Sequence, residues 1–442
     1  MDEKSLQQLT ACDAAARLDA GEFSAEQYVL ALLARVDEVE PAVQAWHQLD
    51  REYLLEQARN ADERHRRGEP AGALFGVPVG VKDIVDVRGL PTEDGTVLHA
   101  GRMPRRDAAL VRRLRAAGAL VMGKTVTTEL ATLAPGKTRN PHDPAHTPGG
   151  SSSGSAAAVA AGMVPLAVGT QTNGSVIRPA SFCGVVGFKP SFGLISRAGV
   201  LTQSPPLDQV GVFARSIDDA ALLAQALAGH DEDDAHSWPA PPPPLLRLAR
   251  SEPPVPPTLA FVRTPFWDRI DPDARDAFDG LAELLGERAA DAVQWLRTIM
   301  EADLAGSFDE EYEHAREQLS ASLRGQIERG RQVSAVDYRR AVARIGPLND
   351  GFDALFDQYD AILTPATLGT APAGLDATGD PLLCTLWTLT GMPAISLPLL
   401  RGANGLPIGV QLVGRRHDDA RLLRTARWLD ATVRQALKET PA

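Results

Sequence analysis

Lysine is scarce in this chain, and its distribution marks one region where amine chemistry could occur. Of the 45 basic residues, 39 are arginine, and the six lysines are Lys4, Lys82, Lys124, Lys137, Lys189 and Lys438. Four of the six lie between positions 82 and 189. Arginine keeps its proton in proteins, whereas a desolvated lysine can lose its proton and act as a base. Six residues are too few to assign a role, so the distribution only indicates where to look.

The segment 147–190 lies in the same region and consists largely of glycine, serine, alanine and threonine, with almost no charge. A flexible linker is excluded, because a helical piece at 156–161 and a strand-like piece at 166–168 are interleaved in it. A phosphate-binding loop is disfavoured, because GGSSSGS fits neither GxxxxGK[ST] nor GxGxxG. Residues 150–154 match GxSxG with Ser152 in the centre, but a loop-like RNPHDPAHTP precedes them where that motif needs a strand. An esterase that uses Ser152 therefore stays as an alternative.

Longer motifs in and around this segment carry a resemblance to a known family. TPGGSSSGSAAAVAAG is followed by GTQTNGSVIRPASFCGVVGFKPS, with GVPVGVKDIVDVRGLPTEDGT upstream and LDQVGVFARSIDDAALL and GMPAISLPL…GLPIGVQLVG downstream. Together these motifs resemble the amidase signature family over roughly residues 70–225 and 360–430. Residues 240–355 match no pattern that we can name.

The resemblance implies hydrolysis of a small carboxamide to a carboxylate and ammonia or amine, through an acyl-enzyme and without a metal or other cofactor. At the positions that match the family, Lys82 is the catalytic lysine and Ser151 is a proton-relaying serine that follows a cis peptide bond. Ser175 is the nucleophile. The resemblance places the oxyanion hole at the backbone N–H groups of Thr172, Asn173, Gly174 and Ser175.

These residue types suit that chemistry. A serine hydroxyl is a weak nucleophile and needs a base within hydrogen-bond reach, and Ser–Lys pairs are variants of the triad arrangement. Lys82 must be neutral to act as a base. Lowering a lysine pKa from about 10.4 to about 7 costs ~4–5 kcal/mol, which burial in a site without carboxylates can supply. Asp83 would oppose this, but neighbours on a strand point to opposite faces, so we expect it to point away.

The chain departs from the commonest family form in one loop. It has QTNGSVIR where that form has Asp-Thr-Gly-Gly-Ser-Ile-Arg, so Asn173 replaces a glycine and Arg178 lies one position further from the serine. Asparagine tolerates positive φ best after glycine. The shifted arginine resembles a family subset that acts on small acidic amides. Arg178 is therefore predicted to bind a substrate carboxylate, although it could equally tie loops together or pair with a protein carboxylate such as Asp208.

The surrounding elements predict an α/β fold. Val77, Val79 and Val81 alternate with Pro78 and Gly80 and indicate a strand that ends at Lys82. Asp107 is predicted to cap a helix that ends near Gly118, and a short buried strand, ALVMGK, follows it. Alternating strands and helices are typical of α/β architecture. The resemblance implies one large domain over residues 1–442, a mixed β-sheet sandwiched between α-helices.

Within that domain we expect four segments. They are an N-terminal helical segment at 1–65, the signature core at 70–225, a variable helical region on the substrate side at 240–355, and a return to the core sheet at 360–442. Ser24 and Gln27 predict a capping box in the first segment. The proline-rich residues 239–257 predict a stiff, exposed connector.

Composition limits the classes of partner. The net charge of −12 argues against nucleic acid and anionic membranes. Three scattered cysteines form neither a disulfide framework nor a metal motif. The N-terminus does not read as a signal peptide, and no apolar run reaches the length of a membrane span. We therefore expect a cytoplasmic protein with a small-molecule amide substrate, no metal, no nucleic-acid or membrane partner, and a possible homodimer formed through the N-terminal helices.

Two further functional alternatives remain. One is the amidase-type component of a tRNA-dependent amidotransferase, which the acidic charge and the lack of a recognisable tRNA-binding appendage disfavour. The other is a non-catalytic binding relative, which the intact Lys82, Ser151 and Ser175 disfavour. The sequence does not reveal which amide is the substrate.

Overall fold

A computed structural model describes residues 2–261, 267–272 and 288–439 of the chain. A single mixed sheet forms its centre, with the strand order β1-β3-β2-β4-β6-β5-β9-β10-β8-β7 among the described residues. Strand β2 is parallel to β3 and β4, β7 is parallel to β8, and the other pairs are antiparallel. The strands are β1 Trp46–Gln48, β2 Pro78–Lys82, β3 Leu120–Thr125, β4 Leu166–Gln171, β5 Val186–Lys189, β6 Gln209–Ala214, β7 Leu259–Phe261, β8 Ala361–Pro365, β9 Ala394–Arg401 and β10 Pro407–Val413.

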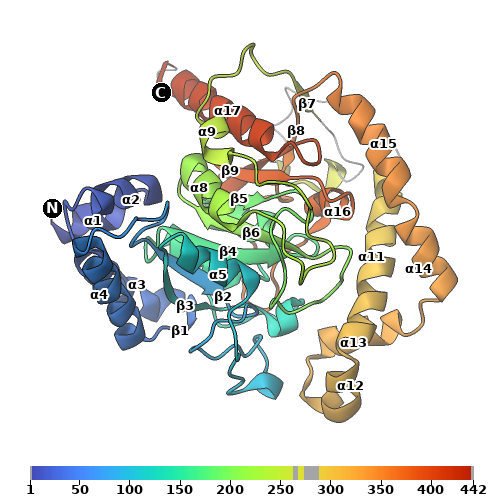
Figure 1. Ribbon diagram of the computed structural model, residues 1–442. Helices are drawn as coiled ribbons and strands as arrows, with labels where there is room; N and C mark the ends of the chain where they lie inside the picture. Colours follow the sequence, from blue (N-terminus) through green and yellow to red (C-terminus); the bar gives the residue numbers. More distant parts are fainter. Residues whose placement is uncertain (1, 262–266, 273–287, 440–442) are drawn as a thin grey trace.

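Helices cover both faces of this sheet, as predicted (Figure 1). Helices α5, α8 and α17 pack against one face, and α6 and α7 pack against the other. The helices that contact the sheet or flank it near the N-terminus are α1 Glu3–Gln8, α2 Ala11–Asp19, α3 Ala25–Val43, α4 Arg51–Arg66, α5 Ala109–Ala116, α6 Ser153–Ala160, α7 Ile177–Cys183, α8 Ile217–Leu227 and α17 Asp419–Glu439. The chain is therefore a single α/β domain.

The described part of the region 240–355 is mainly helical. Figure 1 shows α11 as a long helix along the flank opposite the N-terminal helices, with α12 to α15 around it. These helices and their neighbours are α9 Leu245–Ala249, α11 Arg288–Ser307, α12 Asp309–Ala315, α13 Ala321–Gly330, α14 Ala335–Val342, α15 Ile345–Phe356 and α16 Leu382–Leu389. We call α11 to α13 the helical arm. The parts of the predicted helical region at 262–266 and 273–287 lie outside the described residues.

Helix starts predicted from side chains are right at one helix and wrong at another. The capping box at Ser24 and Gln27 is formed in both directions. The predicted cap at Asp107 is wrong, because Ala108 occupies that position without a side-chain bond. The Asp107 carboxylate instead accepts hydrogen bonds from the backbone N–H of Arg88 and from Arg115.

The proline-rich connector is only partly exposed. Helix α9 forms inside it, and Leu245 and Ala249 are fully buried there. This helix contacts α8 and α17, so its apolar residues extend the core. Composition alone could not indicate that a short apolar run within the prolines would dock onto the domain.

Candidate active site

Lys82 ends β2 in the interior of the domain, beside the ends of two parallel neighbours. Strand β2 is parallel to β4, and Val81 is paired with Val168, so Thr170 lies at the same edge of the sheet as Lys82. Ser151 lies just before α6 and follows a cis peptide bond between Gly150 and Ser151, the feature that the resemblance implied. The ends of β2 and β4 and the turn before α6 therefore bring Lys82, Thr170 and Ser151 together.

The Lys82 amine contacts hydroxyl groups. Its Nζ lies 2.7 Å from Ser151 Oγ and 2.8 Å from Thr170 Oγ1. Lys82 is fully buried, and burial lowers the pKa of its amine well below the usual value, while the charge of Asp208 opposes that shift. Asp83 faces the other way, as expected, and lies 2.8 Å from Lys124 Nζ. The environment of Lys82 therefore favours the neutral amine that a base requires.

Ser175 lies in the loop that joins β4 to α7 and is half-buried. The Gln171 side chain shapes this loop, because its Oε1 accepts the N–H groups of Val176 at 2.8 Å and Ile177 at 3.0 Å. Asn173 Oδ1 accepts a hydrogen bond from Thr385 on α16, and Asn173 does not adopt positive φ. Its side chain is thus accommodated without backbone strain.

The backbone N–H groups of this loop are available to a ligand. Within the described residues, no hydrogen bond is made by the N–H groups of Thr172, Asn173, Gly174 and Ser175. Unpaired backbone donors beside a serine are the arrangement that stabilises an oxyanion during acyl transfer.

A small pocket of about 40 Å³ opens on Ser175. Its walls come from the 131–133 loop, the 172–175 loop and the helical arm, with Met300 and Leu304 on α11 and Gln326 on α13. Gln326 is 3% exposed, and its Oε1 has no hydrogen-bond partner among the described residues. Buried polar atoms are normally paired, so an unpaired acceptor in this pocket indicates a place for a ligand donor.

The 131–133 wall of this pocket begins in strained backbone. Leu130 has φ 45° and Ala131 has φ 56°, two consecutive non-glycine residues in the left-handed region. Such residues persist only where the surroundings hold them. Leu130 is held on both sides, because its N–H donates to Asp94 O and its carbonyl accepts from Gln203 Nε2.

Arg178 reaches the same pocket with a guanidinium that is held mainly by backbone carbonyls. Its Nη2 donates to Gly150 O at 2.7 Å and to Thr378 Oγ1 at 3.2 Å, and its Nη1 donates to Gly379 O at 2.9 Å. Its Nε is buried and has no partner within the described part of the chain. Burial lowers the pKa of Arg178 to about 10. Binding of a substrate carboxylate stays a prediction, for which the Nε proton and the second proton of Nη1 are not used by the printed contacts.

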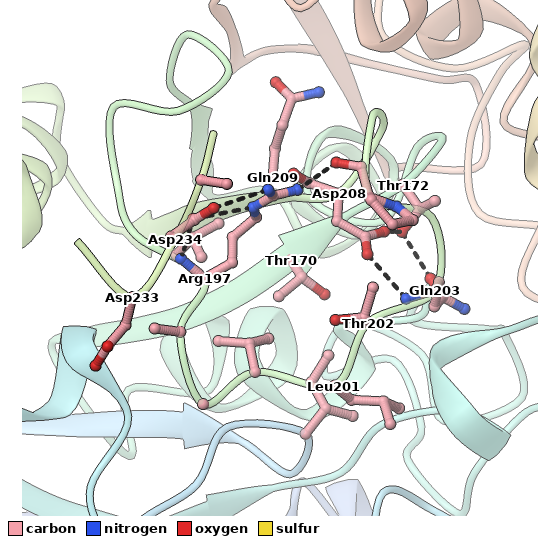
Figure 2. A pocket seen from close by; sticks show the side chains of 17 residues that line it. Thr170, Thr172, Arg197, Leu201, Thr202, Gln203, Asp208, Gln209, Asp233 and Asp234 are labelled. Carbon is pink, nitrogen blue, oxygen red and sulfur yellow. Dashed lines mark hydrogen bonds and ion pairs between the residues drawn. The ribbon is translucent and has the colours of Figure 1, made fainter. Parts of the chain in front are cut away.

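Asp208 does not pair with Arg178. Its carboxyl group contacts Thr172, Gln203 and Ser204 instead, beside a second pocket of about 280 Å³ that shares Thr172 and Gln203 with the first (Figure 2).

The esterase alternative is wrong. Ser152 is fully buried, and its Oγ donates to Thr170 O at 3.1 Å and accepts Thr170 N–H at 3.2 Å. No strand of the described chain leads directly into it, so it does not sit at a strand–turn–helix elbow. Its role is to fix Thr170, which in turn contacts Lys82.

Comparisons with known proteins identify the family of this chain. The sequence pattern of the family named Amidase matches residues 27–299 and 290–423. The A subunit of the glutamyl-tRNA(Gln) amidotransferase of Chloroflexus aggregans is 34% identical to this chain, in an alignment that covers 95% of each protein. The chain belongs to the amidase signature family.

Solved structures of amidase signature enzymes share the fold. A structure described as an unexpected vestigial protein complex that reveals the evolutionary origins of an s-triazine catabolic enzyme matches with a TM-score of 0.90 and 29% identity, covering 96% of this chain and 98% of the other. The 6-aminohexanoate cyclic dimer hydrolase matches with a TM-score of 0.86 and 27% identity, covering 97% of both chains. The predicted family and fold are thus confirmed.

The expectation that nucleic acid has no part in the function needs correction. Relatives of this amidase, including the one from Acidothermus cellulolyticus at 35% identity, are named as subunits of a glutamyl-tRNA(Gln) amidotransferase. Net charge is a property of the whole surface, and it does not report which partners an assembly brings together. No helix in the described ranges is long and apolar enough to span a membrane.

Sequence reasoning did not identify several residues of this amidase site. Thr170 could have been found, because it lies two residues beyond the expected strand at 166–168, on the neighbour of the lysine strand. Gln326, Met300 and Leu304 carried no signal, because they come from helices more than a hundred residues further along the chain.

Proposed function

We propose that this amidase hydrolyses a carboxamide through an acyl-enzyme on Ser175. Neutral Lys82 takes the proton of Ser151 while Ser151 takes the proton of Ser175, and Ser175 Oγ attacks the amide carbon. The N–H groups of residues 172–175 stabilise the oxyanion. The proton returns through Ser151 to the leaving nitrogen, and water then hydrolyses the ester to a carboxylate. The observation that supports this proposal best is the buried contact between Lys82 and Ser151.

We further propose that the amide chemistry serves an amidotransferase assembly, with this chain as its amidase component beside partner subunits and tRNA. The support is similarity over nearly the whole length of both chains to proteins named as the A subunits of glutamyl-tRNA(Gln) amidotransferases. In such a role the ammonia released at Ser175 would be passed on rather than lost to solvent.

A stand-alone amidase for a small amide is the second candidate. The pocket at Ser175 favours it, because a volume of about 40 Å³ suits a small group and the unpaired Gln326 Oε1 suits a substrate N–H. In this case the apolar side chains of Met300 and Leu304 would select the acyl group.

Cellular location and self-association extend the proposal. Cys12, Cys183 and Cys384 are all unpaired, which suits a cytoplasmic protein. The N-terminal helices remain our proposed surface for a homodimer. Light scattering of the native chain and of Leu30→Glu, which changes an exposed leucine of α3, measures the mass in solution, and a dimeric mass that persists in the variant would reject this surface.

Ammonia release tests the function directly. The purified chain is given glutamine and a panel of neutral, aromatic and acidic amides, with Ser175→Ala as the control. The proposal predicts release from at least one amide, and no release by the control. A rate on glutamine that rises when glutamyl-tRNA and partner subunits are added supports the amidotransferase role. An unchanged rate on glutamine, with faster turnover of a small amide, supports the stand-alone enzyme. Equal release by Ser175→Ala would reject Ser175 as the nucleophile.

A further inference from the structure

A continuous chain of hydrogen-bond contacts joins Asp208 to the strained wall of the Ser175 pocket. Asp208 Oδ1 lies 2.6 Å from Thr172 Oγ1, and Thr172 Oγ1 lies 2.6 Å from Gln203 Oε1. Gln203 Nε2 then donates to Leu130 O at 2.9 Å. Figure 2 shows Asp208, Thr172 and Gln203 side by side at the second pocket.

The number of available protons does not match these three contacts. The Thr172 hydroxyl has one proton and cannot donate to both Asp208 and Gln203 Oε1. With an ionised Asp208, one of these two contacts would bring together two oxygens with no proton between them. A separation of 2.6 Å is a hydrogen-bond distance for O–H···O and is repulsive without a proton.

Turning the Gln203 amide around does not remove the deficit. Its nitrogen would then donate to Thr172, and the Thr172 hydroxyl could donate to Asp208. However, Gln203 Oε1 would then take the place of Nε2, 2.9 Å from the Leu130 carbonyl oxygen. These two acceptors would have no proton between them. In either orientation there are three contacts and two protons, so a third proton is needed.

We propose that Asp208 carries this proton and donates it to Thr172, which makes Asp208 a positioning residue for the amidase site. The order of donation is then Asp208 to Thr172, Thr172 to Gln203, and Gln203 to Leu130. The inference rests on the proposed function, because Thr172 begins the oxyanion loop. It adds that the proton on Asp208 completes the hydrogen-bond chain that joins this loop, through Gln203, to Leu130 on the opposite wall of the pocket.

The surroundings of Asp208 suit a neutral acid. Its other oxygen, Oδ2, accepts the N–H groups of Gln203 at 2.8 Å and Ser204 at 3.0 Å, so both oxygens remain paired when Oδ1 is protonated. Burial raises the pKa of Asp208 to about 6, against the lowering effects of these hydrogen bonds and of Arg197.

The charged groups around Asp208 are compatible with its protonated form. The charged and titratable groups around Asp208 are Lys82 on β2, Arg197 with its partner Asp234, and Asp303 on α11, which accepts from Ser204. Arg197 is already paired with Asp234 at 3.0 Å, and it also donates to the backbone oxygen of Asp208.

Protonation of Asp208 also benefits Lys82. An ionised Asp208 raises the pKa of Lys82 and so favours the charged amine, which cannot act as a base. A neutral Asp208 removes that effect. With Asp208 protonated, Lys82 therefore has no negative charge from this carboxyl group in its surroundings.

The test compares pH profiles of Asp208→Asn, Asp208→Ala and the native chain. Asparagine can donate to Thr172 through Nδ2 and accept both backbone N–H groups through Oδ1, so it reproduces the protonated acid. The wild-type rate should fall as pH rises through the pKa of Asp208. In Asp208→Asn this fall should be absent, and the rising limb that reports Lys82 should move to lower pH. Asp208→Ala should lose about 10-fold relative to the native chain below the pKa of Asp208, since one hydrogen bond of the chain is gone, and it should also lack the alkaline fall.

The readout is the rate at which a fluorophosphonate modifies Ser175, which needs no known amide substrate. Labelling of Ser175 by the native chain supports the proposed function whatever the Asp208 variants do. If Asp208→Asn loses as much as Asp208→Ala while both unfold at wild-type temperatures, the carboxylate is the required form and the proposal is overturned. An alkaline fall that persists unchanged in Asp208→Asn would also overturn it. If Asp208→Ala does not fold, Thr172→Val takes its place in the test. The proposal requires that the rate of Thr172→Val does not fall at high pH.

Discussion

Two buried lysines on neighbouring strands of this amidase have opposite surroundings. Lys82 ends β2, and Lys124 lies on β3 beside Val81. Both side chains are fully buried. Lys124 Nζ lies 2.8 Å from Asp83 and 2.6 Å from Thr92 Oγ1, whereas Lys82 Nζ contacts the hydroxyls of Ser151 and Thr170.

The difference shows how one residue type serves two purposes. Burial lowers the pKa of both amines, but Asp83 opposes the shift at Lys124 from a direct contact. Asp83 follows Lys82 directly in the sequence, and the pleat of β2 turns it to the other lysine. The partner of a buried lysine, rather than its burial, therefore separates a structural ion pair from a candidate base.

Charge-conserving substitutions should separate the two lysines most strongly. Lys82→Arg supplies a positive charge but cannot take up a proton, so we expect kcat/KM to fall by about 10²–10⁴-fold, as for the loss of a general base. Lys124→Arg is the matched control and should retain most activity if the variant folds. The measurement is steady-state kinetics on the best amide of the panel. High activity in Lys82→Arg would mean that only the positive charge matters.

Stability should change in opposite directions when each lysine becomes methionine. Lys124→Met leaves Asp83 without its buried partner, so we expect a loss of ~3–5 kcal/mol. Lys82→Met should stabilise the fold at pH 7 by about 1 kcal/mol, because a destabilising functional group is replaced by an apolar one. Denaturant unfolding followed by circular dichroism measures both.

The pH dependence of stability gives the sign of the Lys82 effect. The unfolded chain protonates this lysine below its ordinary pKa of about 10.4, and the folded chain does not until its lowered pKa is reached. Between these two pKa values the unfolded state binds more protons, so the wild-type gains stability as pH rises. Lys82→Met should be less pH-dependent in this window. An identical dependence in both chains would contradict a neutral Lys82.

Arg178 extends the comparison to a third buried cation, which is held by backbone carbonyls. Arg178→Leu frees the Gly150 carbonyl beside Ser151, so every substrate should lose some turnover. If Nε also binds a substrate carboxylate, an acidic amide should lose a further ~2 kcal/mol of transition-state binding relative to a neutral amide of similar size. The measurement is kcat/KM for both amides in both chains. Equal losses would assign Arg178 to positioning the loop that carries Ser151.

The sequence predicted the parts of the fold that depend on side-chain pattern. Alternating valines predicted β2 up to Lys82, and the small residues at 156–161 predicted the second half of α6. The motifs also predict Ser151 and Ser175 as site residues, because long stretches of small residues with fixed order are specific. These features lie within continuous segments, so local spacing carries them.

Other parts of the site leave no such signal. The carbonyl partners of Arg178 are backbone atoms, which every residue has. The proton on Asp208 depends on the order of three hydrogen bonds between distant residues. The sequence of α11 does not indicate that Met300 and Leu304 line the pocket at Ser175. Contacts of this kind follow from packing and need the structure.

Mapping the serine that reacts with a fluorophosphonate tests the central claim most directly. The intact chain is treated, digested and analysed by mass spectrometry, with Lys82→Ala and Ser151→Ala treated in parallel. We expect an adduct on Ser175 in the native chain and much slower labelling in both variants, because Ser175 then lacks its base or its proton relay. An adduct on Ser152, or labelling of Ser175 at the same rate in all three chains, would contradict this mechanism.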